Sequence, residues 1–345
     1  MRIIVATTHT IPAYSGGWTT PLDLLGNDHQ VMYIVRNYKA GTRIIEGIKC
    51  VGVGSSGSIT CSWDFAEKYR HAAVQRLFRM ALKKHFREFN ADFVLCLDPE
   101  AGYSAMYSDL PYAMRFHSKL ESEHLGSDFG ALMKNSTFAT ACPATHIPDL
   151  EVLAHNQDLS RFVYTESQSA EKALLLTSID RIHEPELFVE GVMLSKTMKG
   201  DIVGTGQDRK RIVSLCKETN GRVRCLPPVP RLKVPELLSN YQVGIATVQE
   251  VSPIVYQMKV NAYMAAGLYT LAKPWTHIAY EAPGLISTFT TARDMADHLD
   301  YLCDNWAETL ETRRKARDWI HKHYSVEIPR KRFNEILKEK FPAKT

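Results

Sequence analysis

The chain has 345 residues, of which 45% are hydrophobic and 23% charged, and this length predicts a globular protein of two domains. Its formal net charge of +4 permits an anionic ligand or surface but does not require one. Apolar runs fall short of the ~18–20 residues that a membrane helix needs, and seven cysteines without a C-x-x-C pair favour reduced thiols and a cytoplasmic protein.

Short β-branched runs alternate with amphipathic segments along the whole chain. The strands predicted in the first half are residues 1–8 (MRIIVATT), 30–36 (QVMYIVR), 92–98 (DFVLCLD) and 111–118 (PYAMRFHS). Residues 65–89 between them have apolar positions three and four apart and are predicted to be a helix. The strands predicted in the second half are residues 172–178 (KALLLTS), 199–206 (KGDIVGTG), 222–228 (RVRCLPP), 241–247 (YQVGIAT) and 268–274 (LYTLAKP).

This alternation predicts the α/β class, with two doubly wound, Rossmann-like domains built on parallel sheets. Their ligand crevices would lie beyond the carboxyl ends of the strands. A polar stretch over residues 146–162 places the boundary, which gives domains of 1–158 and 159–322. The basic segment 323–345 is predicted to be helical on either side of Pro329 and could cross back to the first domain.

The segment YQMKVNAYMAAG, residues 256–267, places a lysine near the start of a predicted helix. Ser252 and Pro253 resemble an N-cap and a first helical position, and Gly267 resembles a C-terminal stop, so we expect about four turns. Lys259 then lies at the end that the helix dipole makes positive. A bound anion would explain this, whereas the alternative is a solvated lysine on a helix face.

Two pairs of glycines follow strands. Gly16 and Gly17 lie in the first βα turn, where they could admit a ligand or form a tight turn. Gly204 and Gly206 match half of a G-x-G-x-x-G fingerprint, but Arg209 occupies the third glycine position. This argues against a dinucleotide site and leaves phosphate or sugar contact through backbone amides open.

Histidines and arginines supply the remaining candidates. His117, Glu121 and His124 have helical spacing but lack a fourth ligand, so no metal site is predicted. His117 also ends a strand, which would point it toward the crevice, and the alternative is a satisfied surface histidine. The run from Arg330 to Arg332 could contact a polyanion or form a solvated helix face.

In its order of motifs the sequence resembles the GT-B glycosyltransferases, close to the retaining family 4. Gly16 and Gly17 match the family's glycine pair, ADFVLCLDPEAG its p-D-v-v-h-x-h-d-p-e-a-g segment, and MRFHS the strand that ends in an active-site histidine. VLAHNQDLSRF resembles the interdomain segment, DIVGTGQDRKRIVSL the v-G-x-G segment, and KVNAYMAAGLYTLA the K-l-x-E-Y-m-A-a-G-x-P-V-v-a segment.

Three positions depart from the family pattern. The family's ribose-binding glutamate falls on Ala262, and its diphosphate-binding arginine and lysine fall on Ser178 and His183. Arg181 lies nearby and could substitute. The pair Met258-Lys259 also resembles the donor loop of the bacterial xanthan glucuronosyltransferases, whose lysine contacts the donor phosphates.

The resemblance implies a GT-B fold with two domains facing a central cleft. It implies catalytic roles for His117, Lys259 and Arg181. The donor-binding residues that it implies are Gly16, Gly17, Ser178, His183, Gly204, Gly206, Ser252, Pro253, Tyr256, Met258, Lys259 and Ala262.

The implied reaction moves a sugar from a nucleoside-diphosphate sugar, with UDP-sugars expected first, to an acceptor hydroxyl with retention. No metal or other cofactor is expected. The acceptor could be a glycan, a lipid-linked sugar, a small molecule or DNA. Three alternatives stay open, namely a DNA-base-modifying transferase of phage type, a catalytically degenerate binding subunit and a sugar-nucleotide epimerase.

The role implied for His117 is tested by His117→Ala. Turnover should fall more than nucleotide affinity does, because the imidazole would act on the reacting sugar or diphosphate rather than on the base. Steady-state kinetics and calorimetric titration of the nucleotide separate the two effects. Equal losses in both would contradict the assignment.

Overall fold

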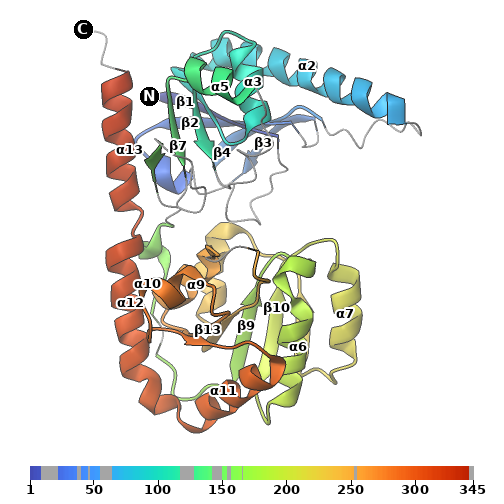
Figure 1. Cartoon of the computed structure of the whole chain (residues 1–345), viewed down its shortest axis with the longest axis vertical. Coiled ribbons are helices and arrows are strands. Elements are labelled where there is room, and N and C mark those ends of the chain that lie inside the picture. The colour runs from blue at the N-terminus through green and yellow to red at the C-terminus, as the bar shows by residue number, and fades with distance from the viewer. Residues whose placement is uncertain are drawn as a thin grey trace. The chain divides into compact units, whose positions relative to one another are not determined.

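The computed structural model describes residues 1–8, 22–36, 40–45, 47–54, 64–116, 128–141, 150–153, 157–164, 166–251 and 255–341, with the backbone alone of 64–72, 74 and 128. These residues form two compact units (Figure 1). Unit 1 contains the described residues up to 153 and residues 327–341, and unit 2 contains residues 157–326. In the part of the chain described, no helix is long and apolar enough to cross a membrane.

Unit 1 is built on a largely parallel sheet with the strand order β3-β4-β2-β1-β5-β6-β7-β8. Its strands are β1 (Arg2–Thr7), β2 (Gln30–Val35), β3 (Gly41–Ile45), β4 (Ile48–Gly52), β5 (Phe93–Cys96), β6 (Tyr112–Phe116), β7 (Phe138–Ala141) and β8 (Glu151–Val152). Only β3 runs antiparallel to its neighbour. The four strands predicted from the first half of the sequence are confirmed. The hairpin β3–β4 and the strands β7 and β8 were not predicted.

Helices cover both faces of this sheet. On one face lie α2 (Asp64–Phe89), α3 (Pro99–Met106) and α5 (Asp128–Asn135), and α2 confirms the helix predicted over residues 65–89. Phe78 and Leu82 of α2 pack there against Ile4 and Ala6 of β1. The odd-numbered side chains of β1, Ile3 and Val5, point to the opposite face. This alternation is the two-residue period of a strand buried on both sides.

The last helix, α13 (Glu327–Lys340), covers the second face of the unit 1 sheet. Phe333 and Leu337 join the same apolar cluster as Ile3 and Val5. The preceding helix, α12 (Leu310–Tyr324), belongs to unit 2, so the chain returns to its first unit between these two helices. The break lies at residues 325–326 and not at Pro329, which the sequence favoured. Pro329 occupies the first turn of α13, where its missing N–H leaves no hydrogen bond unmade.

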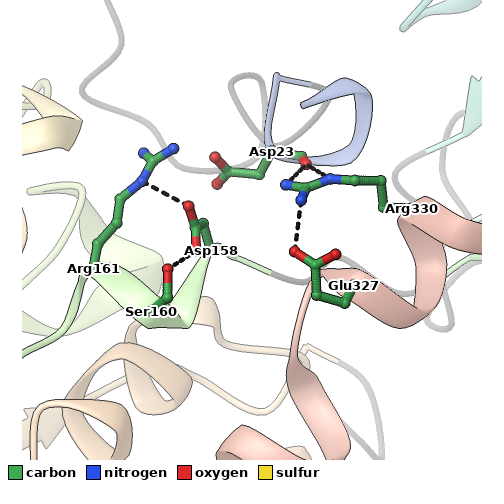
Figure 2. Close-up of polar contacts among 6 residues, drawn as sticks. All are labelled: Asp23, Asp158, Ser160, Arg161, Glu327 and Arg330. Carbon is green, nitrogen blue, oxygen red and sulfur yellow. Dashed lines mark hydrogen bonds and ion pairs between the residues drawn. The ribbon is translucent and has the colours of Figure 1, made fainter. Parts of the chain in front are cut away.

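Two arginines fasten α13 to unit 1. Figure 2 shows the Arg330 guanidinium donating to the Asp23 carbonyl from Nε (3.0 Å) and Nη2 (2.6 Å) while it pairs with Glu327 (2.6 Å). Arg332 makes a two-pronged ion pair with Glu151 at 2.8 and 3.0 Å. Both guanidinium groups are therefore engaged within the unit. These contacts give both arginines structural partners, and the contact of this basic run with a polyanion stays a prediction.

Unit 2 has a parallel sheet in the order β11-β10-β9-β12-β13-β14, the strand order of a Rossmann fold. Its strands are β9 (Lys172–Leu176), β10 (Lys199–Val203), β11 (Val223–Leu226), β12 (Val243–Ala246), β13 (Tyr269–Ala272) and β14 (Ser287–Thr288). The first five confirm the strands predicted from the second half of the sequence. Strand order reverses between β9 and β12, which pair directly with each other.

The helices of unit 2 also form two layers. One face is covered by α6 (Pro185–Leu194), α7 (Arg209–Lys217) and α11 (Ala292–Asp304), and the other by α8 (Val234–Leu238), α9 (Met258–Ala265), α10 (His277–Glu281) and α12. Short 3₁₀ turns are η3 (Leu159–Arg161), η4 (Arg181–His183), η5 (Arg231–Lys233) and η6 (Trp306–Thr309). At η3, Figure 2 shows Asp158 accepting hydrogen bonds from Ser160 and from Arg161 Nε (3.0 Å).

Helix α9 is shorter than the sequence predicted. It begins at Met258, with Gln257 as its N-cap, and not at Ser252 and Pro253, which lie outside the described residues. Val255 precedes it in a β-bridge with Thr276. The predicted stop is confirmed, because Gly267 has φ +77° and the amides of Gly267 and Leu268 bond back to Met264 and Tyr263.

Gly267→Ala is predicted to destabilise unit 2 strongly. A Cβ at this position would lie 2.0 Å from the Tyr164 ring, and the left-handed backbone disfavours any side chain. We expect the backbone to cost about 1–2 kcal/mol and the collision a further ~1–3 kcal/mol of unfolding free energy. Gly284→Ala is the matched control, because Gly284 has φ +87° with open space around it. Chemical denaturation that shows equal losses would refute the collision.

Candidate functional site

The candidate site lies at the carboxyl edge of the unit 2 sheet, where strand order reverses between β9 and β12. Crossovers on the two sides of such a point leave toward opposite faces, so the loops part and leave room for a ligand. Thr177 follows β9, Thr247 follows β12, and Lys259 lies in the first turn of α9. The three residues come from separate segments of the sequence, and the sheet brings them to one edge.

Lys259 is a partly buried cation that a hydroxyl holds in place. Its Nζ donates to Thr177 Oγ1 at 2.9 Å. Burial lowers the pKa of Lys259 to about 7, and the nearby Asp180 carboxylate opposes this shift. Because Thr177 is neutral, it orients the ammonium without neutralising it. An anion that bound here would favour the protonated form and raise the pKa again.

His183 lies beside Lys259 at the end of η4. Its Nδ1 lies 2.8 Å from Asp180 Oδ1, and the same oxygen accepts the His183 amide at 3.1 Å. The Thr247 hydroxyl donates to the His183 carbonyl and ties η4 to the end of β12. Burial, and after it the charge of Lys259, lowers the pKa of His183. A neutral ring that donates Nδ1–H to Asp180 leaves the Nε2 lone pair available.

A buried polar cluster sets the start of α9 and with it the position of Lys259. The Gln257 amide donates to His277 Nδ1 (3.3 Å), and Gln257 Nε2 donates to Thr276 Oγ1 (2.8 Å). His277 Nε2 lies 3.0 Å from Asn261 Oδ1. Burial lowers the pKa of His277 to about 3, so the ring is neutral at ordinary pH and accepts at Nδ1 while donating at Nε2. Sequence reasoning missed this cluster.

Lys273 is a second buried lysine that sequence reasoning missed. It follows β13, and its Nζ donates to the Thr290 carbonyl at 2.8 Å and lies 3.9 Å from Glu184 Oε2. Burial lowers the pKa of Lys273, which Glu184 and Asp294 oppose. Glu184 has φ 43° immediately after His183. The pair thus links η4 to the end of β13. The available signal was a lysine near the end of the strand predicted over residues 268–274.

The two glycines after β10 are explained by packing. A Cβ on Gly204 would lie 1.8 Å from the Thr177 carbonyl oxygen, and one on Gly206 would lie 2.2 Å from that of Ile179. The turn after β10 therefore lies directly against the loop after β9. Because only glycine allows this approach, these residues shape the edge where Lys259 lies.

The other predicted site residues have different surroundings. Ser178 and Arg181 are exposed beside His183, and Met258 begins α9 next to Lys259. Ala262 is buried in the apolar core of unit 2. The Tyr256 ring stacks on His277 with 4.1 Å between ring centroids. The predicted residues Gly16, Gly17, His117, Ser252 and Pro253 lie outside the described residues.

Arg224 in β11, and Arg222 just before this strand, have structural partners. Arg224 makes two hydrogen bonds of 2.7 Å with Asp201, which also accepts from the Tyr241 hydroxyl at 2.7 Å. Arg222 donates to the carbonyls of Val192 and Ser195 at the end of α6. Within the described residues, no cluster of three or more His, Cys, Asp or Glu side chains could hold a metal ion.

No protein-family model and no curated protein matches the sequence, but solved structures share its fold. A sucrose-phosphate synthase from Thermosynechococcus elongatus has a TM-score of 0.73 and 11% identity over 99% of this chain and 100% of that one. HepE from Anabaena, in complex with UDP and glucose, has a TM-score of 0.73 and 11% identity over 98% and 100%.

A glycosyltransferase from Rickettsia africae has a TM-score of 0.66 and 12% identity, covering 99% of both chains. Similarity at this level of identity establishes a shared fold. The chain therefore has the GT-B fold of glycosyltransferases, with two Rossmann-like domains, as the sequence predicted.

Because the pKa of Lys259 is depressed in the folded protein, we predict that the free energy of unfolding depends on pH. An unfolded lysine keeps its proton up to a pH of about 10.4, so between pH 7 and 10 the unfolded chain binds more protons than the folded one. The free energy of unfolding therefore gains a contribution as pH rises through this range. Lys259→Met should lack this pH-dependent contribution. At pH 6 it should be more stable than wild type, because wild type buries a charged lysine there.

Urea denaturation of wild type, Lys259→Met and Lys217→Met between pH 6 and pH 9 measures this contribution. Lys217 lies exposed in the last turn of α7 and serves as the control. The curve of Lys217→Met should run parallel to that of wild type. A parallel curve for Lys259→Met as well would show that Lys259 keeps an ordinary pKa.

Proposed function

We propose that this protein is a glycosyltransferase that moves a sugar from a nucleoside-diphosphate sugar to an acceptor hydroxyl. The observation that carries the proposal is Lys259, a cation held by a neutral hydroxyl at the switch point of unit 2. The fold supports it, because HepE shares this fold and was solved with UDP and glucose and with UDP-glucose. We therefore expect a UDP-sugar as the donor.

Lys259 would bind the diphosphate of the donor. The anion would raise the pKa of Lys259 from about 7, so binding at pH 7 to 8 would be accompanied by proton uptake. The first backbone amides of α9 lie at the positive end of the helix dipole and would add hydrogen-bond donors to the diphosphate. The Lys259 ammonium and these amides would together bind the negatively charged diphosphate at the carboxyl edge of the unit 2 sheet.

The same groups would act on the bond-breaking step. As the sugar leaves, negative charge accumulates on the diphosphate, and donors already aimed at it need no reorganisation. Arg181, exposed in η4, would approach the diphosphate from solvent. His183, with Nδ1 held by Asp180, would present Nε2 to the sugar or phosphate. His117 would complete the reacting centre, as the resemblance to family 4 implies.

Retention of anomeric configuration and independence from metal are part of the proposal. Retention rests on the resemblance to family 4. Metal independence rests on the cations, because Lys259 and Arg181 could supply the charge that a divalent ion provides in other enzymes. Turnover that persists in EDTA would agree with this, and loss of turnover restored by Mg²⁺ or Mn²⁺ would contradict it.

Lys259→Ala is predicted to weaken UDP binding by at least tenfold and to lower turnover on the order of 100-fold, because it removes a charged donor aimed at the diphosphate. The measurement is a panel of nucleoside diphosphates and their sugars by thermal shift, since a ligand of the native state raises its melting temperature. Calorimetric titration of the strongest ligand follows.

Lys217→Ala is the matched control and should bind like wild type, because Lys217 lies at the far end of α7 from the carboxyl edge. A shift for one nucleotide that Lys259→Ala abolishes identifies the donor site and its base. If wild type binds no nucleotide in the panel, the protein is a binding subunit with this fold and not a transferase.

A further inference from the structure

The second half of α2 carries an excess of basic side chains. Residues 75–89 of this helix contain five Lys and Arg and a single acid, Glu88. The helix segment thus carries a net charge of +4, equal to the formal net charge of the whole 345-residue chain. A segment of fifteen residues with this excess creates a strong local positive potential.

The cations lie on the outward face of α2, together with two large apolar side chains. Leu77 is 51% exposed and Met80 is 60% exposed. Arg76, Lys83, Lys84 and Arg87 are exposed on either side of them. Spacings of three, four and seven residues place all six on one stripe of the helix. The opposite stripe is buried, with Phe78 and Leu82 fully enclosed against the sheet.

The stripe continues onto the neighbouring helix. Tyr107, at the end of α3, is 60% exposed, and the Arg79 guanidinium lies 5.9 Å from its ring centroid. Glu88 is the acid nearest to the stripe in the sequence of α2, and it pairs with Lys84 (3.8 Å) and His85 (2.9 Å). Figure 1 shows α2 beside α3, which packs on the same face of the unit 1 sheet.

We propose that this stripe of α2 binds the surface of an anionic lipid bilayer. A bilayer interface accepts both kinds of side chain at once, since lysine and arginine pair with acidic headgroups while leucine and methionine enter the acyl boundary. A nucleic acid would pair with the cations but would leave Leu77 and Met80 in water, because single strands are bound through aromatic stacking and duplexes through polar groups. The helix carries too much charge to cross a membrane, and so it would lie on one.

The experiment is sedimentation of the purified full-length protein with vesicles, in the absence of any donor. Vesicles of phosphatidylcholine with 30% phosphatidylglycerol should bind the protein at low salt, whereas pure phosphatidylcholine should not. The variant Leu77→Gln/Met80→Gln keeps the charge and the helix propensity, and should weaken binding about tenfold. The variant Lys83→Gln/Lys84→Gln should weaken it roughly fivefold for each lysine removed.

The control is Lys172→Gln/Lys217→Gln, which removes two exposed lysines from unit 2 and should bind vesicles like wild type. Circular dichroism and the melting temperature establish that each variant is folded. Failure of wild type to bind the acidic vesicles overturns the proposal. So does duplex DNA binding that exceeds vesicle binding and is unchanged in Leu77→Gln/Met80→Gln, which would assign the stripe to a nucleic acid. Neither outcome affects the nucleotide panel, so this proposal and the proposed function fail separately.

Discussion

The reversal of strand order between β9 and β12 is the constraint on which the candidate site depends. Each crossover in a parallel sheet returns its polar loop to the carboxyl edge, and only at the reversal do neighbouring loops part. Thr177, His183 and Lys259 meet at this edge although they belong to three loops or helix starts. Glycines at positions 204 and 206 let the turn after β10 lie directly against the Thr177 loop. The sheet topology thus determines which polar groups meet.

Unit 2 buries several ionisable groups, and these groups differ in the partners that surround them. His277 stays neutral, because burial lowers its pKa to about 3 and both ring nitrogens have partners. Lys273 has a carbonyl and a carboxylate nearby. Lys259 has a hydroxyl, which orients the ammonium without compensating its charge. The nearby Asp180 carboxylate offsets only part of the cost of burying this charge, so a lysine in this state is expected where an anionic ligand supplies further negative charge.

The two basic segments of unit 1 have opposite roles. Arg330 donates hydrogen bonds to the Asp23 carbonyl and Arg332 donates to Glu151, and these contacts hold α13 against unit 1. The cations of α2 lie outward, with Leu77 and Met80 exposed among them. The sequence alone does not distinguish these two clusters of Lys and Arg. The contacts that each cluster makes in the folded protein show whether it stabilises the fold or is exposed to a ligand.

The sequence by itself determined nine of the described strands, the long helix α2, the stop at Gly267 and a lysine near the start of α9. These features depend on local rules of side-chain period, backbone conformation and dipole direction. Only the tertiary structure decided that α9 begins at Met258, because its start is set by Gln257, Thr276 and His277 across the fold. The sequence did not predict the partners of Lys273, Arg330 and Arg332 either. Their contacts join residues far apart in the chain, and long-range pairing of this kind leaves no periodic signal in the sequence.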